Sequence, residues 1–178
     1  EDCVEAELAA AAWAREHGAV WISPYNDLRV VEGQGTVAAE LLEQLPAFDE
    51  VLVPVGGGGL IGGMAACLKA ARPEVRVVGC QPRASCVMAR SVAAGRLLDL
   101  PSLPTLSDAT AGGVEPGSIT FELCRDLVDD WILVGEDEIG AAIRLVHEQE
   151  DLIVEGAAAL TVAALLGESK RFRGRRVV

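Results

Sequence analysis

Apolar residues along the chain follow two spacings that alternate with each other. Residues 4–17 carry them three or four positions apart, as one face of a helix does, and the run stops before Gly18, a residue typical of helix C-termini. Short runs of β-branched, aromatic or uninterrupted apolar residues predict strands instead. We expect strands at 19–22, 51–55, 75–80 and 131–134, and helices at about 4–17, 36–45, 60–71, 84–94, 118–127, 136–146 and 156–166.

The middle of the chain predicts a parallel sheet. Residues 51–55 are apolar throughout, as strands covered on both faces are, and the helix at 60–71 and the strand at 75–80 follow directly. A strand, a helix and a strand in this order require parallel strands. The further alternation indicates an α/β fold: a doubly wound, mainly parallel sheet with helices on both faces. The connection at 97–117 is long and rich in Pro, Gly, Ser and Thr, as functional loops often are.

Composition narrows the class of protein. The 178 residues carry a formal charge of −12 and are 51% hydrophobic, which predicts one acidic, well-cored domain over residues 1–178. Such a charge disfavours binding to nucleic acid or to anionic membrane surfaces. The uncharged stretch 51–68 does not predict a membrane span, because Pro54 and six glycines interrupt it. No cationic segment opens the chain, so we expect no signal peptide.

The cysteines and the chain ends add two expectations. The cysteines are odd in number, form no C-x-x-C pair and lie mostly in apolar runs, so we expect buried, reduced thiols in a cytoplasmic protein. They are Cys3, Cys67, Cys80, Cys86 and Cys124. The chain opens on Glu1 instead of Met and stops as an apolar run begins at Val177, which indicates a piece of a longer polypeptide.

A glycine run lies between the strand at 51–55 and the helix at 60–71. Its members are Gly56, Gly57, Gly58 and Gly59. Backbone N–H groups of successive glycines can turn toward an anion, and a helix N-terminus adds unpaired amides and a positive dipole end. We therefore expect a phosphate site here. The alternative is a tight packing turn that needs no ligand.

Two nucleotide motifs compete for this loop. Gly57, Gly59 and Gly62 satisfy the G-x-G-x-x-G pattern of dinucleotide sites, but Gln81 stands after the next strand, where an acid would hold the ribose. A P-loop is excluded because no Gly-Lys-Ser/Thr follows. A smaller phosphate ligand therefore fits better.

Several motifs, spread in order over nearly the whole chain, carry a family resemblance. They are Pro24-Tyr25-Asn26-Asp27, Gly33-Gln34-Gly35-Thr36, Val53-Pro54-Val55-Gly56-Gly57-Gly58-Gly59-Leu60, Asp129-Asp130 with Glu136-Asp137-Glu138-Ile139, and Val154-Glu155-Gly156-Ala157. The chain resembles the serine/threonine dehydratase and serine racemase family, which depends on pyridoxal phosphate (PLP), has fold type II and is related to the tryptophan synthase β chain. The resemblance implies most of the large, cofactor-binding domain, without the N-terminal part, the small domain and the extreme C-terminus.

The resemblance also implies roles for individual residues. PLP would be the cofactor, Gly56 to Gly59 would hold its phosphate through backbone amides, and Leu60 would open the helix behind them. Glu155 would approach the pyridine ring; the alternative is an ordinary acid at a helix N-terminus. Asp108 matches a loop position near the family's active site, although a lone loop Asp is more often a turn residue.

The chain departs from the family in its lysines. The family uses a lysine to form a Schiff base with PLP, and only Lys69 and Lys170 are present. Lys69 lies roughly 15 Å along the helix from Gly59, at 1.5 Å per residue. Lys170 belongs to a basic C-terminal stretch. We therefore assign no catalytic residue to this chain.

A metal site of the family is also altered. Some members bind a divalent cation after the strand that matches 75–80. The corresponding places here are Gln81, Ser85 and Val87, which offer no carboxylate to a hard cation. We therefore expect no metal.

The leading hypothesis is a PLP-dependent dehydratase, an ammonia-lyase. In its complete form it would convert L-threonine, L-serine or a related hydroxy amino acid into a 2-oxo acid and ammonia. Its expected partners are the amino acid substrate and further copies of the chain in a homo-oligomer. Two alternatives stay open: a non-catalytic, truncated fragment that self-associates through uncovered apolar surface and a strand edge, and an NAD-binding Rossmann domain, if Gln81 can replace the missing acid.

Overall fold

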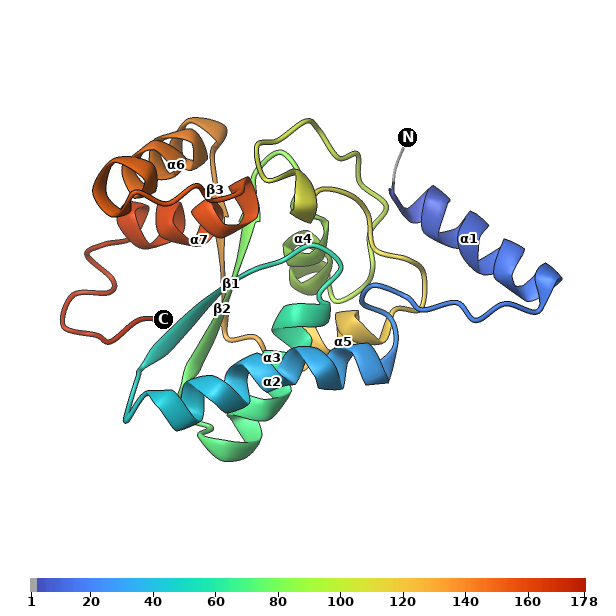
Figure 1. Ribbon diagram of the computed structural model, residues 1–178, viewed down its shortest axis with the longest axis horizontal. Coiled ribbons are helices and arrows are strands. Elements are labelled where there is room, and N and C mark those ends of the chain that lie inside the picture. The colour runs from blue at the N-terminus through green and yellow to red at the C-terminus, as the bar shows by residue number, and fades with distance from the viewer. Residues whose placement is uncertain (1–2) are drawn as a thin grey trace.

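Three parallel strands form the centre of the protein in a computed structural model, which describes residues 3–178 (Figure 1). They are hydrogen-bonded in the order β1 (Glu50–Pro54), β2 (Arg76–Pro82) and β3 (Asp130–Val134). Val177 forms a parallel bridge with Glu50 of β1. The chain therefore winds from β1 to β3 and then returns to pair with the other edge of β1.

Helices cover both faces of this sheet, with the lower layer and the upper left layer of Figure 1 on opposite sides. The helices are α1 (Cys3–His17), α2 (Leu28–Gln44), α3 (Gly59–Ala71), α4 (Val87–Ala94), α5 (Ile119–Leu127), α6 (Glu136–Glu150) and α7 (Gly156–Gly167). Side chains of α2 to α5 share one core with Val51 and Val53, whereas α6 and α7 share the other with Leu52. Because successive strand residues face opposite sides, β1 contributes to both cores. The predicted doubly wound α/β fold is confirmed.

The second helix differs from the sequence prediction. It begins at Leu28 instead of residue 36, and Gly33 and Gly35 lie inside it. Asp27 starts the helix because its side chain accepts a hydrogen bond from the Arg29 amide at 2.9 Å. Gly35 faces α3, where a methyl group added at Gly63 would lie 2.7 Å from the Gly35 nitrogen. Gly33 and Gly35 therefore do not mark the start of the helix. Gly35 instead allows α2 and α3 to approach each other closely.

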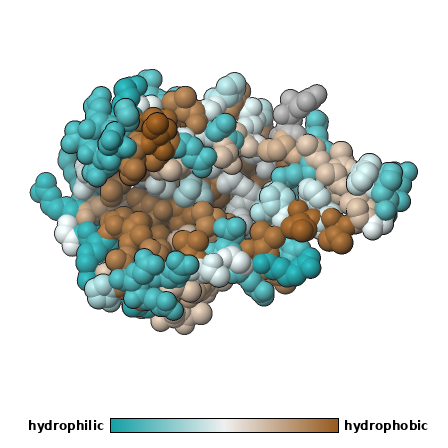
Figure 2. Space-filling view, in the orientation of Figure 1, coloured by the Kyte–Doolittle hydropathy of each residue, from teal (hydrophilic) through white to brown (hydrophobic). Residues whose placement is uncertain are grey.

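The predicted strand at 19–22 is wrong, because these residues form no strand in the structure. Val20 and Ile22 are 79% and 65% exposed. The preceding α1 agrees with its prediction and ends before Gly18, which has a φ of 64°, but only Ala14 of this helix is buried. Figure 1 shows α1 projecting from the body of the protein, and Figure 2 shows apolar surface beneath it. A strand needs a neighbouring strand to pair with, and none of residues 3–178 supplies one there.

The predicted burial of the cysteines is correct for only some of the five. None of the five cysteines forms a disulfide, and Cys80 and Cys124 are buried. Cys67 and Cys86 are partly buried, whereas Cys3 is exposed because it lies at the start of the projecting α1. The other predicted helices and strands are present with small shifts at their ends, and the 97–117 connection contains only a short 3-10 turn at Asp108–Thr110. No helix within residues 3–178 is both long and apolar enough to cross a membrane.

Candidate functional site

A cleft of about 490 Å³ opens where β1 ends. In doubly wound sheets, ligands bind beyond the carboxyl end of a strand whose two neighbours are reached by crossovers on opposite faces. β1 is such a strand, since α3 leads to β2 on one face while α6 and α7 precede Val177 on the other. The lining includes the glycine loop and residues from α1, α2, the 97–117 connection and the start of α7: Cys3, Glu7, Pro24, Tyr25, Gln34, Pro54, Gly56, Gly57, Gly58, Gly59, Leu60, Ile61, Asp108, Ala109, Thr110, Ala111, Gly113, Glu155 and Ala157.

The glycine loop, Gly56 to Gly59, presents free backbone donors. Within the described residues, no group accepts a hydrogen bond from the amides of Gly57 to Ile61, and the first helical bond of α3 runs from the Gly62 amide to the Gly58 carbonyl. The loop and the helix N-terminus thus offer consecutive unpaired N–H groups beside the positive end of the α3 dipole. This arrangement favours an anion.

The conformation of the loop depends on glycine. Gly58 has a φ of 88°, which side chains rarely tolerate, and a methyl group there would lie 3.0 to 3.1 Å from Met88, Thr120 and Cys124. The Thr120 hydroxyl donates to the Gly57 carbonyl at 2.6 Å. Because C=O and N–H point in opposite directions across a trans peptide, this bond turns the Gly58 amide away from Thr120. Close packing alone explains why Gly58 must be a glycine, so this requirement is no evidence for a ligand. The evidence for a ligand is the row of unpaired amides.

The charged side chains of the cleft are all acidic. Glu7, Asp108 and Glu155 line it, and no lysine, arginine or histidine of residues 3–178 does. Any anion at the glycine loop is therefore held by backbone amides and the helix dipole. Asp108 also accepts a hydrogen bond from the Ala109 amide at 2.9 Å, as a turn residue does. Glu155 stands at the N-cap of α7, but its exposed side chain makes no capping hydrogen bond.

Tyr25 and Gln34 are lining residues to which the sequence assigned no role. The Tyr25 hydroxyl donates to Oε2 of Glu7 at 2.9 Å and accepts from the Glu115 amide at 3.0 Å. Burial is the main cause that raises the pKa of Tyr25, so its hydroxyl stays protonated. The only available signal was membership of both residues in the motifs that carry the family resemblance.

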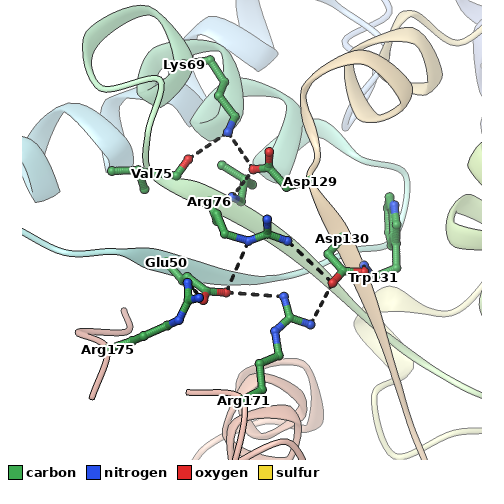
Figure 3. Close-up of polar contacts among 10 residues, drawn as sticks. Glu50, Lys69, Val75, Arg76, Asp129, Asp130, Trp131, Arg171 and Arg175 are labelled. Atoms are coloured by element: carbon green, nitrogen blue, oxygen red, sulfur yellow. Dashed lines mark hydrogen bonds and ion pairs between the residues drawn. The ribbon is translucent and has the colours of Figure 1, made fainter. Parts of the chain in front are cut away.

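Neither lysine reaches the cleft. Lys69 lies in the last turn of α3, at the far end from the glycine loop, and donates to Asp129 at 2.6 Å and to the Val75 carbonyl at 2.8 Å (Figure 3). Lys170 is exposed in the turn after α7. That neither lysine forms the Schiff base stays a prediction.

The residues at the family's metal position form internal hydrogen bonds or pack in the core. Gln81 is buried, donates to the Val55 carbonyl at 3.0 Å and accepts from the Ala89 amide at 2.8 Å. The Ser85 hydroxyl accepts from the Gly112 amide at 3.0 Å, and Val87 is buried in the core. Among residues 3–178, no three His, Cys, Asp or Glu side chains gather as metal ligands would. The absence of a metal here stays a prediction.

Comparison with known proteins decides the family. A family model described as pyridoxal-phosphate dependent enzyme matches residues 1–178. The chain belongs to the pyridoxal-phosphate dependent enzymes. This result confirms the resemblance seen in the motifs.

Individual relatives narrow the group within these pyridoxal-phosphate enzymes. The chain is 43% identical over 164 residues to an L-threonine ammonia-lyase of Thermotoga maritima, covering 92% of this chain and 41% of the relative. It is 39% identical over 165 residues to a serine racemase of Arabidopsis thaliana, covering 93% and 49%. The structure of maize serine racemase matches with a TM-score of 0.87 at 38% identity, over 96% of this chain and 54% of that one. The chain is thus similar to threonine ammonia-lyases and serine racemases and spans about half the length of these relatives.

The residues present fit part of a pyridoxal phosphate site. The unpaired amides from Gly57 to Ile61 match the phosphate, and Glu155 lines the same cleft without capping its helix. A lysine for the aldehyde is not among the residues that line the cleft.

Proposed function

We propose that this chain is most of the cofactor-binding domain of a PLP-dependent ammonia-lyase. The complete enzyme would convert L-threonine, L-serine or a related hydroxy amino acid into a 2-oxo acid and ammonia. The observation that carries the proposal is the row of unpaired amides at the glycine loop, in a chain 43% identical to an L-threonine ammonia-lyase.

The chain's own residues would bind and orient the cofactor. Gly56 to Gly59 and Leu60 hold the phosphate through backbone N–H groups, and Thr120 keeps the loop in shape through the Gly57 carbonyl. Glu155, which lines the same cleft, would approach the pyridine ring. When bound, PLP supplies an electron sink for charge developed at the substrate α-carbon. The lysine that removes the α-proton would come from outside residues 1–178.

The phosphate role is tested with pyridoxamine 5′-phosphate, which carries the phosphate but has no aldehyde to react with lysines. We expect Gly58→Ala to weaken its binding about tenfold or more in calorimetric titration, because the change strains the loop by roughly 1 kcal/mol or more and shifts the amides. Gly33→Ala is the matched control: a methyl group there meets nothing within 4 Å, so affinity should not change. Equal affinity in both variants would contradict the phosphate role.

The reaction itself is tested in the complete polypeptide. Reconstituted with PLP, it should release 2-oxo acid and ammonia from L-threonine, L-serine or a related hydroxy amino acid. Formation of D-serine from L-serine without 2-oxo acid would replace the ammonia-lyase with a racemase. No change in any hydroxy amino acid would refute the reaction and leave the fold unaffected.

A second candidate is a non-catalytic fragment that self-associates. Large apolar side chains are left uncovered, among them Val20, Ile22 and Leu28, each more than 60% exposed. On this reading residues 1–178 form dimers or larger species, and sedimentation velocity should show them at high protein concentration. A monomer at all concentrations would contradict it. Homo-oligomers of the complete enzyme are expected on the same grounds.

A further inference from the structure

The segment between α1 and α2 connects several parts of the cleft. Tyr25 in this segment is only 7% exposed although it lies outside any helix or strand. Two residues next to Tyr25 in the sequence also form hydrogen bonds to distant parts of the chain. Ser23 donates to Glu115 at 3.4 Å, and Asn26 accepts from the Ile119 amide at 2.9 Å. The segment thus joins the 97–117 connection and the start of α5.

The Tyr25 ring packs against the glycine loop. A methyl group added at Gly57 would lie 2.6 Å from Cε1 of the ring, and one added at Gly59 would lie 3.0 Å from the Tyr25 Cβ. On its other side the loop meets Met88, Thr120 and Cys124 around Gly58. The loop is therefore held between the Tyr25 ring and side chains of α4 and α5, which leaves its peptide planes little freedom to turn.

The Tyr25 hydroxyl connects the loop to α1. It donates to Glu7, in the middle of that helix, and accepts from the Glu115 amide. Apolar packing holds α1 only weakly, since Ala14 alone is buried. A hydrogen bond to a charged group contributes more than a neutral one, so the bond to Glu7 helps to fix the helix over the cleft, together with the bond from the Cys3 thiol to the Ala111 carbonyl at 3.3 Å.

We infer that Tyr25 is a positioning residue of the phosphate site: its ring holds the glycine loop in the conformation that presents its amides, and its hydroxyl ties α1 to the same loop. The Tyr25 side chain would then couple the position of α1 to the phosphate-binding conformation of the glycine loop. The part that concerns the phosphate rests on the proposed function, whereas the part that concerns the loop and α1 does not.

The two roles separate in two variants of the full chain. Tyr25→Phe keeps the ring, so pyridoxamine 5′-phosphate should bind within about threefold of wild type, while amide hydrogen exchange in α1 should accelerate about tenfold or more. Tyr25→Leu removes the ring, so exchange of the Gly62 amide, which donates to the Gly58 carbonyl of the loop, should also accelerate. Affinity for pyridoxamine 5′-phosphate should fall about tenfold or more through lost preorganisation. A positioning role therefore predicts that Tyr25→Phe restores the protection of the loop but not that of α1. A general loss of stability would instead accelerate exchange in both regions of both variants.

Matched controls come from the same chain. Phe48→Leu shortens another aromatic side chain that is 5% exposed in the same core, and it should leave exchange of the Gly62 amide unchanged. Glu7→Ala should reproduce the α1 effect of Tyr25→Phe, whereas Glu16→Ala, which removes the same charge from an exposed position of α1, should not. Should Tyr25→Leu fail to fold, Tyr25→Met takes its place.

The outcomes distinguish this inference from the proposed function. Wild-type protein that does not bind pyridoxamine 5′-phosphate refutes the phosphate site, and the exchange data then judge Tyr25 alone. Unchanged exchange of the Gly62 amide in the ring-deleted variant, or unchanged exchange of α1 in Tyr25→Phe, overturns the inference about Tyr25.

Discussion

At the scale of single residues, burial decides which thiols of this protein are reactive. Cys80 lies in the core shared with α6 and α7, and Cys124 lies in the opposite core, beside the glycine loop. Burial is the main cause that raises the pKa of each to about 12. Both therefore stay as neutral thiols at physiological pH, which makes them poor nucleophiles.

Alkylation with iodoacetamide at pH 8 tests this difference in burial. Cys3 is exposed and should be modified quickly, whereas Cys80 and Cys124 should stay unmodified until the protein unfolds. Peptide mass spectrometry before and after addition of guanidinium chloride gives the measurement. Fast labelling of Cys124 in the native protein would show that the core behind the glycine loop is open.

The same thiols predict how stability depends on pH. The folded protein keeps their protons up to about pH 12, whereas the unfolded chain loses them near the ordinary value of 9.0. Stability is therefore fully present below about pH 9 and declines as the pH rises toward 12, because the unfolded state then binds fewer protons. Urea unfolding at several alkaline pH values should show a shallower decline in Cys124→Ala than in Cys86→Ala. Equal slopes would contradict the assignment.

At the scale of elements, close contacts of glycine set how the helices and loops pack. In addition to the contact between Gly35 and Gly63, Gly156 at the start of α7 packs against the 97–117 connection, where a methyl group would lie 2.8 Å from the Ser107 nitrogen. That contact brings Asp108 and Glu155 to the same cleft. The glycine after Glu155 is thus required by packing, which the motif alone did not show.

Two glycine variants test the helix contact. Gly63→Ala should destabilise the protein by about 1–3 kcal/mol, because the added methyl group meets backbone atoms of α2. Gly33→Ala, in the same pair of helices, should stabilise it by about 0.5–1 kcal/mol, since its methyl group meets nothing within 4 Å and alanine favours the helix. Urea unfolding measures both. A loss of stability in both variants would mean that helix propensity and contact distance do not explain the difference.

At the scale of the whole molecule, one buried carboxylate joins the sheet to the C-terminal segment (Figure 3). Glu50 at the start of β1 is 1% exposed and pairs with Arg175 at 2.6 Å and Arg171 at 3.4 Å. Arg171 also pairs with Asp130 of β3 at 2.9 Å, and Arg76 of β2 lies 3.9 Å from Glu50. The basic stretch near the C-terminus, which looks like a solvated tail in the sequence, therefore neutralises a buried acid and aligns Val177 with β1.

Loss of this carboxylate should cost more than loss of a surface one. Glu50→Gln should destabilise the protein by about 1–3 kcal/mol, because charge-assisted hydrogen bonds to Arg171 and Arg175 are lost, while these arginines, 25% and 46% exposed, can still be solvated. Asp126→Asn breaks an exposed pair with Arg125 and should change stability by less than about 1 kcal/mol. Unfolding in urea at constant salt checks both values. A small effect at Glu50 would show that water replaces the carboxylate without penalty.

Local sequence patterns were enough to predict the three strands and their connecting helices, the doubly wound fold and the glycine loop at the end of β1. These features follow from periodicity and from glycine's missing side chain, which are properties of residues near one another in the chain. The absence of a strand at 19–22 and the place of Tyr25 depend instead on contacts with residues distant in the sequence, whereas α2 begins at a local cap, Asp27, that the apolar spacing does not reveal. Tyr25 meets Glu115 across 90 positions and Glu50 meets Arg175 across 125. No local pattern specifies such pairs, because each side chain gains its environment only when the distant partner arrives.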